Sequence, residues 1–245
     1  MERKYELTNE TREYHGMVLH RIRALKDFGS VRDGDLGGWV EKEDNLSQFG
    51  ACWVCGNALV CGNARVYGSA WVYGDARVYE NAQVCGNALV CGNARVYGNA
   101  LVYGNALVCE NALVSGNARV CGDARVYENA LVCGDARVYE NALVSGNALV
   151  SGNALVYGNA AITWCMHIQK TRDYLTVGPV GSRNGFTTFA KDQNGNVAVS
   201  CGCFYGTLDE FSEKVGATHG NNNFGVEYRA AIELAKAHFT EEEEQ

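Results

Sequence analysis

The 245-residue chain has no excess of positive charge, because 21 Lys and Arg residues stand against 28 Asp and Glu residues, for a net charge of -7. Phosphate backbones are bound by clustered Lys and Arg, so this acidic balance argues against a nucleic-acid partner. Residues 1–7 lack an apolar stretch of signal-peptide length, and no apolar run elsewhere approaches a membrane span. We therefore expect a cytoplasmic protein with neither nucleic acid nor membrane as a partner.

A disulfide framework is also missing, although the chain has 11 Cys residues. One recurring position, filled elsewhere by Tyr or Ser, holds seven of them, at positions 55, 61, 85, 91, 109, 121 and 133. Interchange with Tyr and Ser favours reduced thiols. The remaining candidates for zinc, Cys165-Met166-His167 and Cys201-Gly202-Cys203, lack the two-to-four-residue ligand spacing of structural zinc sites, so we expect no metal and no cofactor.

The phrase that recurs is G-[ND]-A-x-V-[YCS], which runs in phase over residues 50–163 as 19 hexads. A fixed short period indicates a solenoid. The Ala and Val of a hexad are two residues apart, so Ala94 and Val96 point to one face of a short strand and Arg95 to the other. Gly98 and Asn99 then supply a corner. Three hexads would close a triangular coil, and successive coils would stack about 4.8 Å apart.

The pattern Val-x-Gly-Asn-Ala-x resembles that of the hexapeptide-repeat proteins. This resemblance implies a mainly β fold, a left-handed parallel β-helix, and the handedness comes from the resemblance. We divide the chain into an N-terminal cap (1–49), the β-helix (50–163) and a small C-terminal α+β domain (164–245). We expect Ala and Val inside the coils, with Arg, Leu, Tyr and Cys outside.

Residues 18 apart should stack on one outer face, as Arg77 and Arg95 or Cys91 and Cys109 would. Such stacks are either a binding face or the ordinary outer surface of a solenoid, and we favour the second. The phrase Gly-Asp-Ala-Arg-Val-Tyr-Glu-Asn occurs three times, at 74–81, 122–129 and 134–141, where Asp and Glu on either side of Arg suggest local charge balancing.

The hexapeptide resemblance also suggests an acyltransferase, which in this family typically uses a His as general base and a loop that leaves the coil. The five His residues, at positions 15, 20, 167, 219 and 238, all lie outside residues 50–163. The repeat has no inserted loop, and no Lys occurs between Lys42 and Lys170. A general base must reach the proton that it removes, so acyl transfer would need a site borrowed from a flanking segment.

The N-terminal flank is expected to cap the solenoid, since open solenoid ends need covering. Residues 17–25 alternate as a strand does, and the turn-rich residues 33–39 lead into the first coil. The stretches Gly-Asp-Leu-Gly-Gly-Trp and Asn-Leu-Ser-Gln resemble the start of uncharacterised hexapeptide-repeat proteins of enteric bacteria, phages and prophages. These relatives are often labelled putative transferases from the repeat alone.

In the C-terminal flank we expect strands at 174–180, 186–191 and 196–201, the last two joined by an Asn-Gly turn. A capping box at Thr207 starts a helix that runs to about 216, a second helix covers 226–239, and residues 241–245 form a solvated tail.

Three polar, Gly-rich loops of this flank are candidates for binding an anion such as phosphate, through backbone N–H groups, hydroxyls, a guanidinium and a helix N-terminus. The alternative is that they are ordinary loops. The candidate residues are Gly181, Ser182, Arg183, Asn184 and Thr187 in or after the first loop, Cys201, Gly202, Cys203, Phe204 and Thr207 in the second, and His219 in the third.

Three functions follow from these patterns. The first is a non-catalytic binder, of phage or prophage type, that sequesters a small anionic nucleotide-like molecule such as a bacterial immune signal. The second is a structural or assembly solenoid, and the third is an acyltransferase. No activated nucleophile or acid–base pair is visible in the loops, which favours the first function over an enzyme.

The outward Leu residues predict an oligomer. They recur at positions 59, 89, 101, 107, 113, 131, 143, 149 and 155, and Leu113, Leu131 and Leu149 should stack on one face. Long exposed apolar stripes usually mark an interface, so we expect a homo-oligomer, either a dimer or a trimer.

Overall fold

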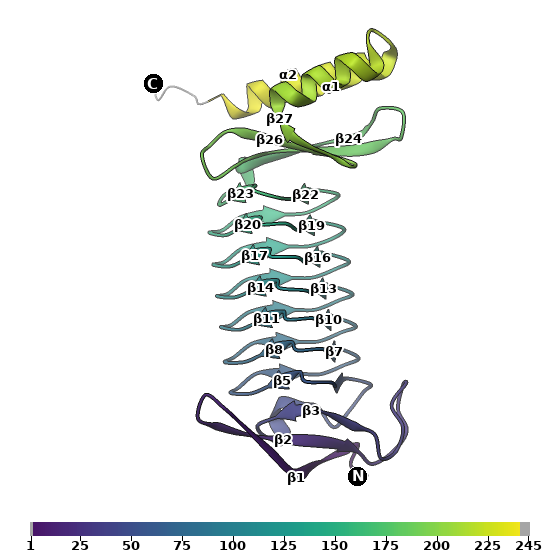
Figure 1. Ribbon diagram of the computed structural model, residues 1–245, viewed down its shortest axis with the longest axis vertical. Helices are drawn as coiled ribbons and strands as arrows, with labels where there is room; N and C mark the ends of the chain where they lie inside the picture. Colours follow the sequence, from purple (N-terminus) through teal and green to yellow (C-terminus); the bar gives the residue numbers. More distant parts are fainter. Residues whose placement is uncertain (1, 241–245) are drawn as a thin grey trace.

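The computed structural model describes residues 2–240, and the expected tail at 241–245 lies outside the described residues. Three parts follow one another along the long axis of the molecule (Figure 1). A β-hairpin lies at the N-terminal end, a three-sided coil forms the body, and a sheet covered by two helices closes the C-terminal end.

Each hexad forms a two-residue strand, and strands 18 residues apart pair in parallel, as Leu89 pairs with Leu107 and Val90 with Val108. The three columns of strands are the three sides of the coil. The first holds β3 (Leu36–Val40), β5 (Leu59–Val60), β8 (Arg77–Val78), β11 (Arg95–Val96), β14 (Leu113–Val114), β17 (Leu131–Val132), β20 (Leu149–Val150) and β23 (His167–Ile168).

The second column holds β4 (Trp53–Val54), β7 (Trp71–Val72), β10 (Leu89–Val90), β13 (Leu107–Val108), β16 (Arg125–Val126), β19 (Leu143–Val144) and β22 (Ala161–Ile162). The third holds β6 (Arg65–Val66), β9 (Gln83–Val84), β12 (Leu101–Val102), β15 (Arg119–Val120), β18 (Arg137–Val138) and β21 (Leu155–Val156). Parallel pairing begins at Trp39 and ends at Ile168, so the coil extends beyond the hexads on both sides.

The interior of the coil confirms the predicted pattern, because the inward Ala and Val of the hexads, replaced by Cys52 in the first and by Ile162 in the last, are buried and form one continuous column. A single coil could not bury this face, which is why the repeat must stack. The expected stack of Arg77 on Arg95 is also confirmed, and Arg119 stacks on Arg137 in the same way. Leu59 and Cys61 are exceptions to the expected exposure, because the N-terminal hairpin covers both side chains.

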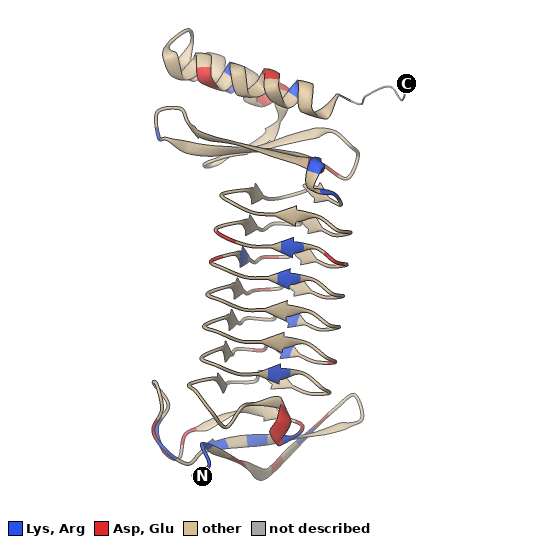
Figure 2. Ribbon diagram, turned by 180° about the vertical axis from the view of Figure 1, so that it is seen from behind, with Lys and Arg blue, Asp and Glu red and all other residues tan. Residues whose placement is uncertain are grey.

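The corners show that the expected charge balancing between Arg and Glu is wrong. Glu80, Glu110, Glu128 and Glu140 take the left-handed corner position that Gly fills elsewhere, with φ near 60°. The carboxylates of Glu80, Glu128 and Glu140 accept from amides of the next coil, as Glu80 Oε2 does from Gly98 (2.8 Å). Figure 2 shows acidic positions at corners and basic positions on strands. Among the described residues, no coil Arg forms an ion pair.

The corner Asn residues form ladders that the hexad pattern did not predict. The side-chain amides of most corner Asn residues donate to the side-chain oxygen one coil further on, as Asn63 does to Asn81 (3.2 Å) and Asn81 to Asn99 (3.1 Å). This ladder continues through Asn117 and ends on the carboxylate of Asp135, which can only accept. A corner Asn such as Asn63 therefore donates two hydrogen bonds to the next coil, one from its backbone N–H and one from its side-chain amide.

The N-terminal cap is built on a hairpin of β1 (Tyr5–Tyr14) and β2 (Met17–Ala24), so the strand expected at 17–25 is confirmed. The expected turn at 33–39 is partly wrong, because Leu36–Val40 is a strand that joins the hairpin to the first coil. Gly38 fits there because a Cβ would lie only 2.6 Å from the carbonyl oxygen of Ala58. A short 3-10 helix, η1 (Glu43–Asn45), follows.

The two ends of the coil expose different backbone groups, and the caps satisfy each with the matching chemistry. The first coil exposes carbonyl groups, to which Lys4 Nζ donates at Cys52 (2.9 Å) and Asn45 Nδ2 at Ala64 (2.8 Å). The last coil exposes N–H groups, and three hydroxyls accept them. These pairs are Leu155 with Thr171 (3.1 Å), Tyr157 with Tyr174 (3.3 Å) and Ala161 with Thr188 (3.0 Å).

The C-terminal domain is a four-stranded antiparallel sheet with two helices on one face (Figure 1). It follows a 3-10 helix, η2 (Thr171–Asp173), and comprises β24 (Tyr174–Val180), β25 (Gly185–Lys191), β26 (Val197–Cys201), β27 (Phe204–Thr207), α1 (Leu208–His219) and α2 (Asn223–Phe239). The predicted strands, the hairpin and both helices are confirmed. The interpretation of 204–207 as a loop is wrong, since these residues pair with β26. Both helices are longer than expected, which leaves only 220–222 between them.

The described residues contain no helix that is long and apolar enough to cross a membrane.

A corner substitution series should separate backbone strain from hydrogen bonding at Glu80. Glu80→Ala keeps a side chain in the left-handed region, which costs about 1 kcal/mol relative to Gly, and removes the carboxylate that accepts from Gly98. We therefore expect Glu80→Gly to be more stable than Glu80→Ala, by about 1 kcal/mol in urea unfolding. Equal stabilities of the two variants would contradict the strain assigned to this corner.

Thiol labelling should follow burial. Burial raises the pKa of Cys61 and of Cys109 to about 11, so both thiols stay protonated at pH 8 and become reactive only as the pH approaches 11. Cys203 is exposed. We expect maleimide at pH 8 to modify Cys203 first and Cys61 and Cys109 much more slowly, as read by mass spectrometry of peptides. A Cys203→Ser variant should lose the fastest phase, and rapid labelling of Cys109 would contradict this order.

Candidate functional site

The open end of the C-terminal sheet, beneath the helices, contains a cavity of about 390 Å³. Three segments that are distant in sequence surround it: the turn between β24 and β25, the turn between β26 and β27, and one side of α1 with the facing part of α2. Its lining residues are Ser182, Arg183, Gly185, Phe186, Cys201, Gly202, Cys203, Phe204, Phe211, Lys214, Val215, Thr218, His219 and Tyr228. We call this cavity the helix-side pocket.

The sheet alternation explains how these side chains meet. Along β25 and β26, Thr187, Phe189, Val199 and Cys201 point to the helices, where Phe189 and Val199 pack with Phe211 and Ile232. The predicted residues that line the pocket are Ser182, Arg183, Cys201, Gly202, Cys203, Phe204 and His219. The sequence places them in three separate loops, and the fold brings them to one cavity.

Four other predicted residues do not line the pocket. The amide of Gly181 donates to Glu227 (2.7 Å), and Asn184 donates to the Gly181 carbonyl to close the turn. Thr187 is buried and its hydroxyl donates to Cys201 Sγ (3.1 Å). Gly181, Asn184 and Thr187 therefore support the pocket wall from behind.

Thr207 is the fourth of these residues, and it is separated from the pocket by the length of β27. Its hydroxyl accepts from the Glu210 amide (3.2 Å), and the Glu210 carboxylate accepts from the Thr207 amide (2.8 Å), as the predicted capping box requires. The turn that begins at Cys201 leads into a strand and not into a helix. The expectation that this turn and a helix N-terminus form one anion site is therefore wrong.

Sequence reasoning missed the helical side of the pocket. Phe211, Lys214, Val215 and Thr218 lie on one face of α1 at helical spacing, and Tyr228 faces them from α2. Helical periodicity places the four α1 residues on one face of that helix, but nothing in the sequence indicates that this face meets the loops.

The pocket has cations at its entrance and aromatic rings in its wall. Arg183 and Lys214 supply positive charge, and neither forms an ion pair within the described residues. The rings of Phe204 and Phe211 lie 5.1 Å apart, and those of His219 and Tyr228 lie 5.5 Å apart. Burial, and next the neighbouring Cys201, raise the pKa of Tyr228 to about 12, so its phenol is protonated and can donate at neutral pH.

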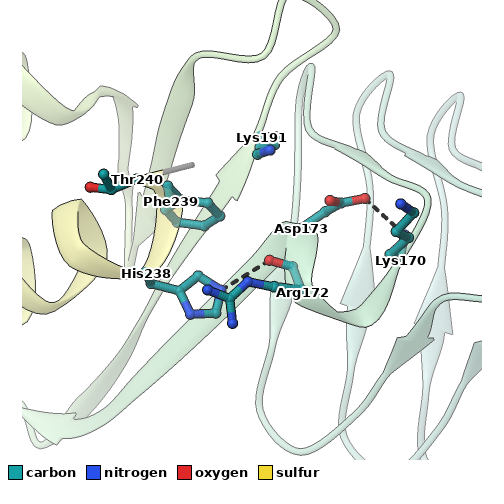
Figure 3. A pocket seen from close by; sticks show the side chains of 7 residues that line it. All are labelled: Lys170, Arg172, Asp173, Lys191, His238, Phe239 and Thr240. Atoms are coloured by element: carbon teal, nitrogen blue, oxygen red, sulfur yellow. Dashed lines mark hydrogen bonds between the residues drawn. The ribbon is translucent and has the colours of Figure 1, made fainter. Parts of the chain in front are cut away.

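A second basic pocket, of about 220 Å³, lies where the last coil meets the end of α2 (Figure 3). Lys170, Arg172 and Lys191 line it, and His238 Nε2 lies 2.9 Å from the Arg172 carbonyl oxygen. The Asp173 carboxylate already accepts a hydrogen bond from the backbone amide of Lys170 (2.8 Å). A helix C-terminus carries partial negative charge, so cations there stabilise α2 and an added anion is disfavoured. The helix-side pocket is also lined by the last residues of α1, Thr218 and His219, so it differs from the basic pocket in its larger volume and in its several aromatic rings and not in the absence of a helix end.

The candidate metal ligands are not assembled. Within residues 2–240, no group of three or more His, Cys, Asp and Glu side chains could hold a metal ion. The expectation that every His lies outside the coil is wrong in one case, because His167 is in β23, paired with Leu149 on an outer face. The hexad pattern ends at residue 163, before His167, so the sequence did not reveal the last strand of the column.

Comparison with known proteins concerns the coil. A family model described as the YdcK beta solenoid repeat matches residues 58–74, 70–86, 82–95, 88–104, 94–110, 118–134 and 142–158. An Escherichia coli (strain K12) protein with the name "Uncharacterized acetyltransferase YdcK" is 37% identical over 60 residues, which cover 21% of this chain and 18% of that relative. The chain thus aligns with under a fifth of that protein's length. The repeats, their three-sided stacking and these matches identify the coil as a β-solenoid of the hexapeptide-repeat, left-handed β-helix family.

Proposed function

We propose that the C-terminal domain binds a small anionic, nucleotide-like molecule in the helix-side pocket and that the coil is a rigid, non-catalytic support. The observation that carries this proposal is the convergence of Arg183, Lys214 and His219 from separate segments on one cavity that also has an aromatic wall. Solenoid coils do not need such a cavity for their own stability.

The size and the chemistry of the pocket favour a nucleotide-like ligand. A volume of about 390 Å³ lies within the range of small-molecule sites. A guanidinium and an ammonium suit phosphate oxygens, which form the stronger, charge-assisted hydrogen bonds. The exposed ring of Phe186 and the half-buried ring of Phe204 offer faces on which a base could stack. A simple anion would contact the cationic side chains but would have no group to stack on the aromatic rings.

The surroundings of Cys201 favour sequestration without turnover. Cys201 is the thiol of the pocket wall that makes hydrogen bonds. Cys201 accepts from the buried Thr187 hydroxyl and lies 3.9 Å from the Tyr228 phenol oxygen, so neither neighbour is a base that could activate it. A captured immune signal of a bacterial host, held but not converted, is the biological role that we propose for a protein of this type.

Acyl transfer is the second candidate, because the Escherichia coli relative is named an acetyltransferase and because His167 lies on an outer face of the last coil. A His is the general base that such a reaction requires. Against it, the hexads themselves contain neither His nor Lys. Formation of acetylated product from acetyl-CoA that disappears in His167→Ala would replace the non-catalytic proposal.

Arg183 should dominate ligand affinity. We expect Arg183→Ala to weaken binding at least tenfold, about 1.4 kcal/mol, because a charge-assisted bond to phosphate is lost, while the coil stays folded. Calorimetry against cyclic dinucleotides, ADP-ribose and acetyl-CoA would measure this. The matched control is Arg172→Ala, which removes a guanidinium from the other basic pocket. A loss in the control instead of in Arg183→Ala would move the site to the end of α2.

We further propose that the chain is a homo-oligomer, associated through the outward Leu stack of β14, β17 and β20. Leu113, Leu131 and Leu149 pair in register there and are half-buried within the single chain. The same column carries Arg77 and Arg95, so Leu131→Arg suits the fold. Light scattering should give a multiple of 26.6 kDa for the wild type and a smaller assembly for Leu131→Arg. A wild-type monomer at micromolar concentration would refute the interface.

A further inference from the structure

A separate cavity lies on the opposite, coil-facing side of the C-terminal sheet, and it has a volume of about 390 Å³. Its floor is the outer face of the last coils near β19 and β22, and its roof is formed by residues of β25, β26 and β27. Tyr127, Trp164, Phe186 and Tyr205 supply four aromatic side chains to its wall. We call it the junction pocket.

Trp164 is the most unusual of these residues. It occupies the corner position that Gly146 occupies one coil below and Glu128 two coils below, and it keeps the left-handed backbone there, with φ of 55°. A bulky residue rarely adopts this conformation. Packing does not explain the choice, because Trp164 remains 54% exposed. Its ring meets Tyr205 edge to face at 4.9 Å, so an aromatic surface is held open towards the cavity.

Glu128 is the one charged side chain that lines the junction pocket. One of its carboxylate oxygens accepts from the Gly146 amide, and this bond fixes the side chain against the coil. Around it the lining is uncharged, with the hydroxyls of Ser145 and Ser200. The nearest Arg of that coil face, Arg125, is one coil further from the sheet than Leu143, and it does not line the cavity.

The lower part of the pocket contains one unsatisfied group. Thr163 Oγ1 is buried and makes no hydrogen bond within the described residues. Burial raises the pKa of Tyr205 and the Thr163 hydroxyl opposes this shift, but the two groups do not form a hydrogen bond of normal geometry. Buried hydroxyls are rarely left unpaired, and this one belongs to a cavity that could admit a polar group.

We propose that the junction pocket binds an organic cation through an alkylated ammonium group. Aromatic faces attract such cations through their quadrupoles, and aromatic cages are the usual receptors of quaternary ammonium groups. The Glu128 carboxylate adds an opposite charge, and the overall charge of -7 favours the approach of cations. A phosphate would meet a carboxylate with no lining cation, and a metal ion would lack a cluster of ligands within residues 2–240.

The corner position supplies test variants that preserve the fold. Trp164→Gly restores the residue that most corners carry and relieves the left-handed strain, so it should fold at least as well as the wild type. Glu128→Gln keeps an oxygen for the Gly146 amide and removes the charge. Glu80→Gln makes the same change at an equivalent corner outside the junction pocket and is the matched control.

The probes are choline and 3,3-dimethylbutan-1-ol, its uncharged isostere, titrated into the full chain by NMR or calorimetry. We expect saturable binding of choline, at least tenfold weaker binding of the alcohol, and at least tenfold weaker choline binding in both Trp164→Gly and Glu128→Gln. Glu80→Gln and Arg183→Ala should bind choline as the wild type does, which separates this pocket from the helix-side pocket.

Absence of saturable choline binding by the folded wild type would overturn the proposal, and so would equal affinity for the uncharged isostere. Unchanged choline affinity in folded Trp164→Gly and Glu128→Gln would also overturn it, since the cation would then bind elsewhere. None of these results bears on the helix-side pocket, whose ligand is tested through Arg183.

Discussion

Each coil of the solenoid is held by backbone N–H groups that donate to carbonyl groups of the next coil, as Leu89 donates to Ala106 and Asn87 to Gly104 at 2.9 and 2.8 Å. This one-way arrangement lets the coil grow without limit and gives its two ends opposite chemistry. It also explains the monotony of the sequence, because only a residue pattern that returns every 18 positions keeps Ala and Val in one buried column.

The caps follow from that polarity. The N-terminal end exposes carbonyl groups and is covered by donors, among them the buried ammonium of Lys4, whose pKa burial lowers while its contact with Cys52 opposes the shift. The C-terminal end exposes N–H groups and is covered by hydroxyls, including that of Thr188 from β25. Side-chain bonds of this kind seat the C-terminal sheet directly on the last coil. The junction pocket and the basic pocket beside α2 exist because the sheet covers that end incompletely.

The helix-side pocket and the junction pocket differ in charge although they share Phe186 and Gly202 in their walls. The helix-side pocket has Arg183 and Lys214 and suits an anion, whereas the junction pocket has Glu128 and suits a cation. The helix-side pocket and the junction pocket lie on opposite faces of the C-terminal sheet, because successive side chains of a strand point to opposite faces. The coil contributes to the second pocket through Trp164 and Glu128, so it is more than a spacer in this part of the molecule.

The sequence by itself determined the coil, since a period of six residues leaves one way to bury Ala and Val, and local signals such as the Thr207 capping box determined the helices. It also identified most of the loop residues in the helix-side pocket. The tertiary structure alone decided that corner Glu side chains such as Glu80 accept from the next coil's amide, that Leu36–Val40 is a strand, and that Phe211, Lys214 and Tyr228 line the same pocket as Arg183. These features depend on contacts between residues distant in sequence, for which neither periodicity nor local propensity carries a signal.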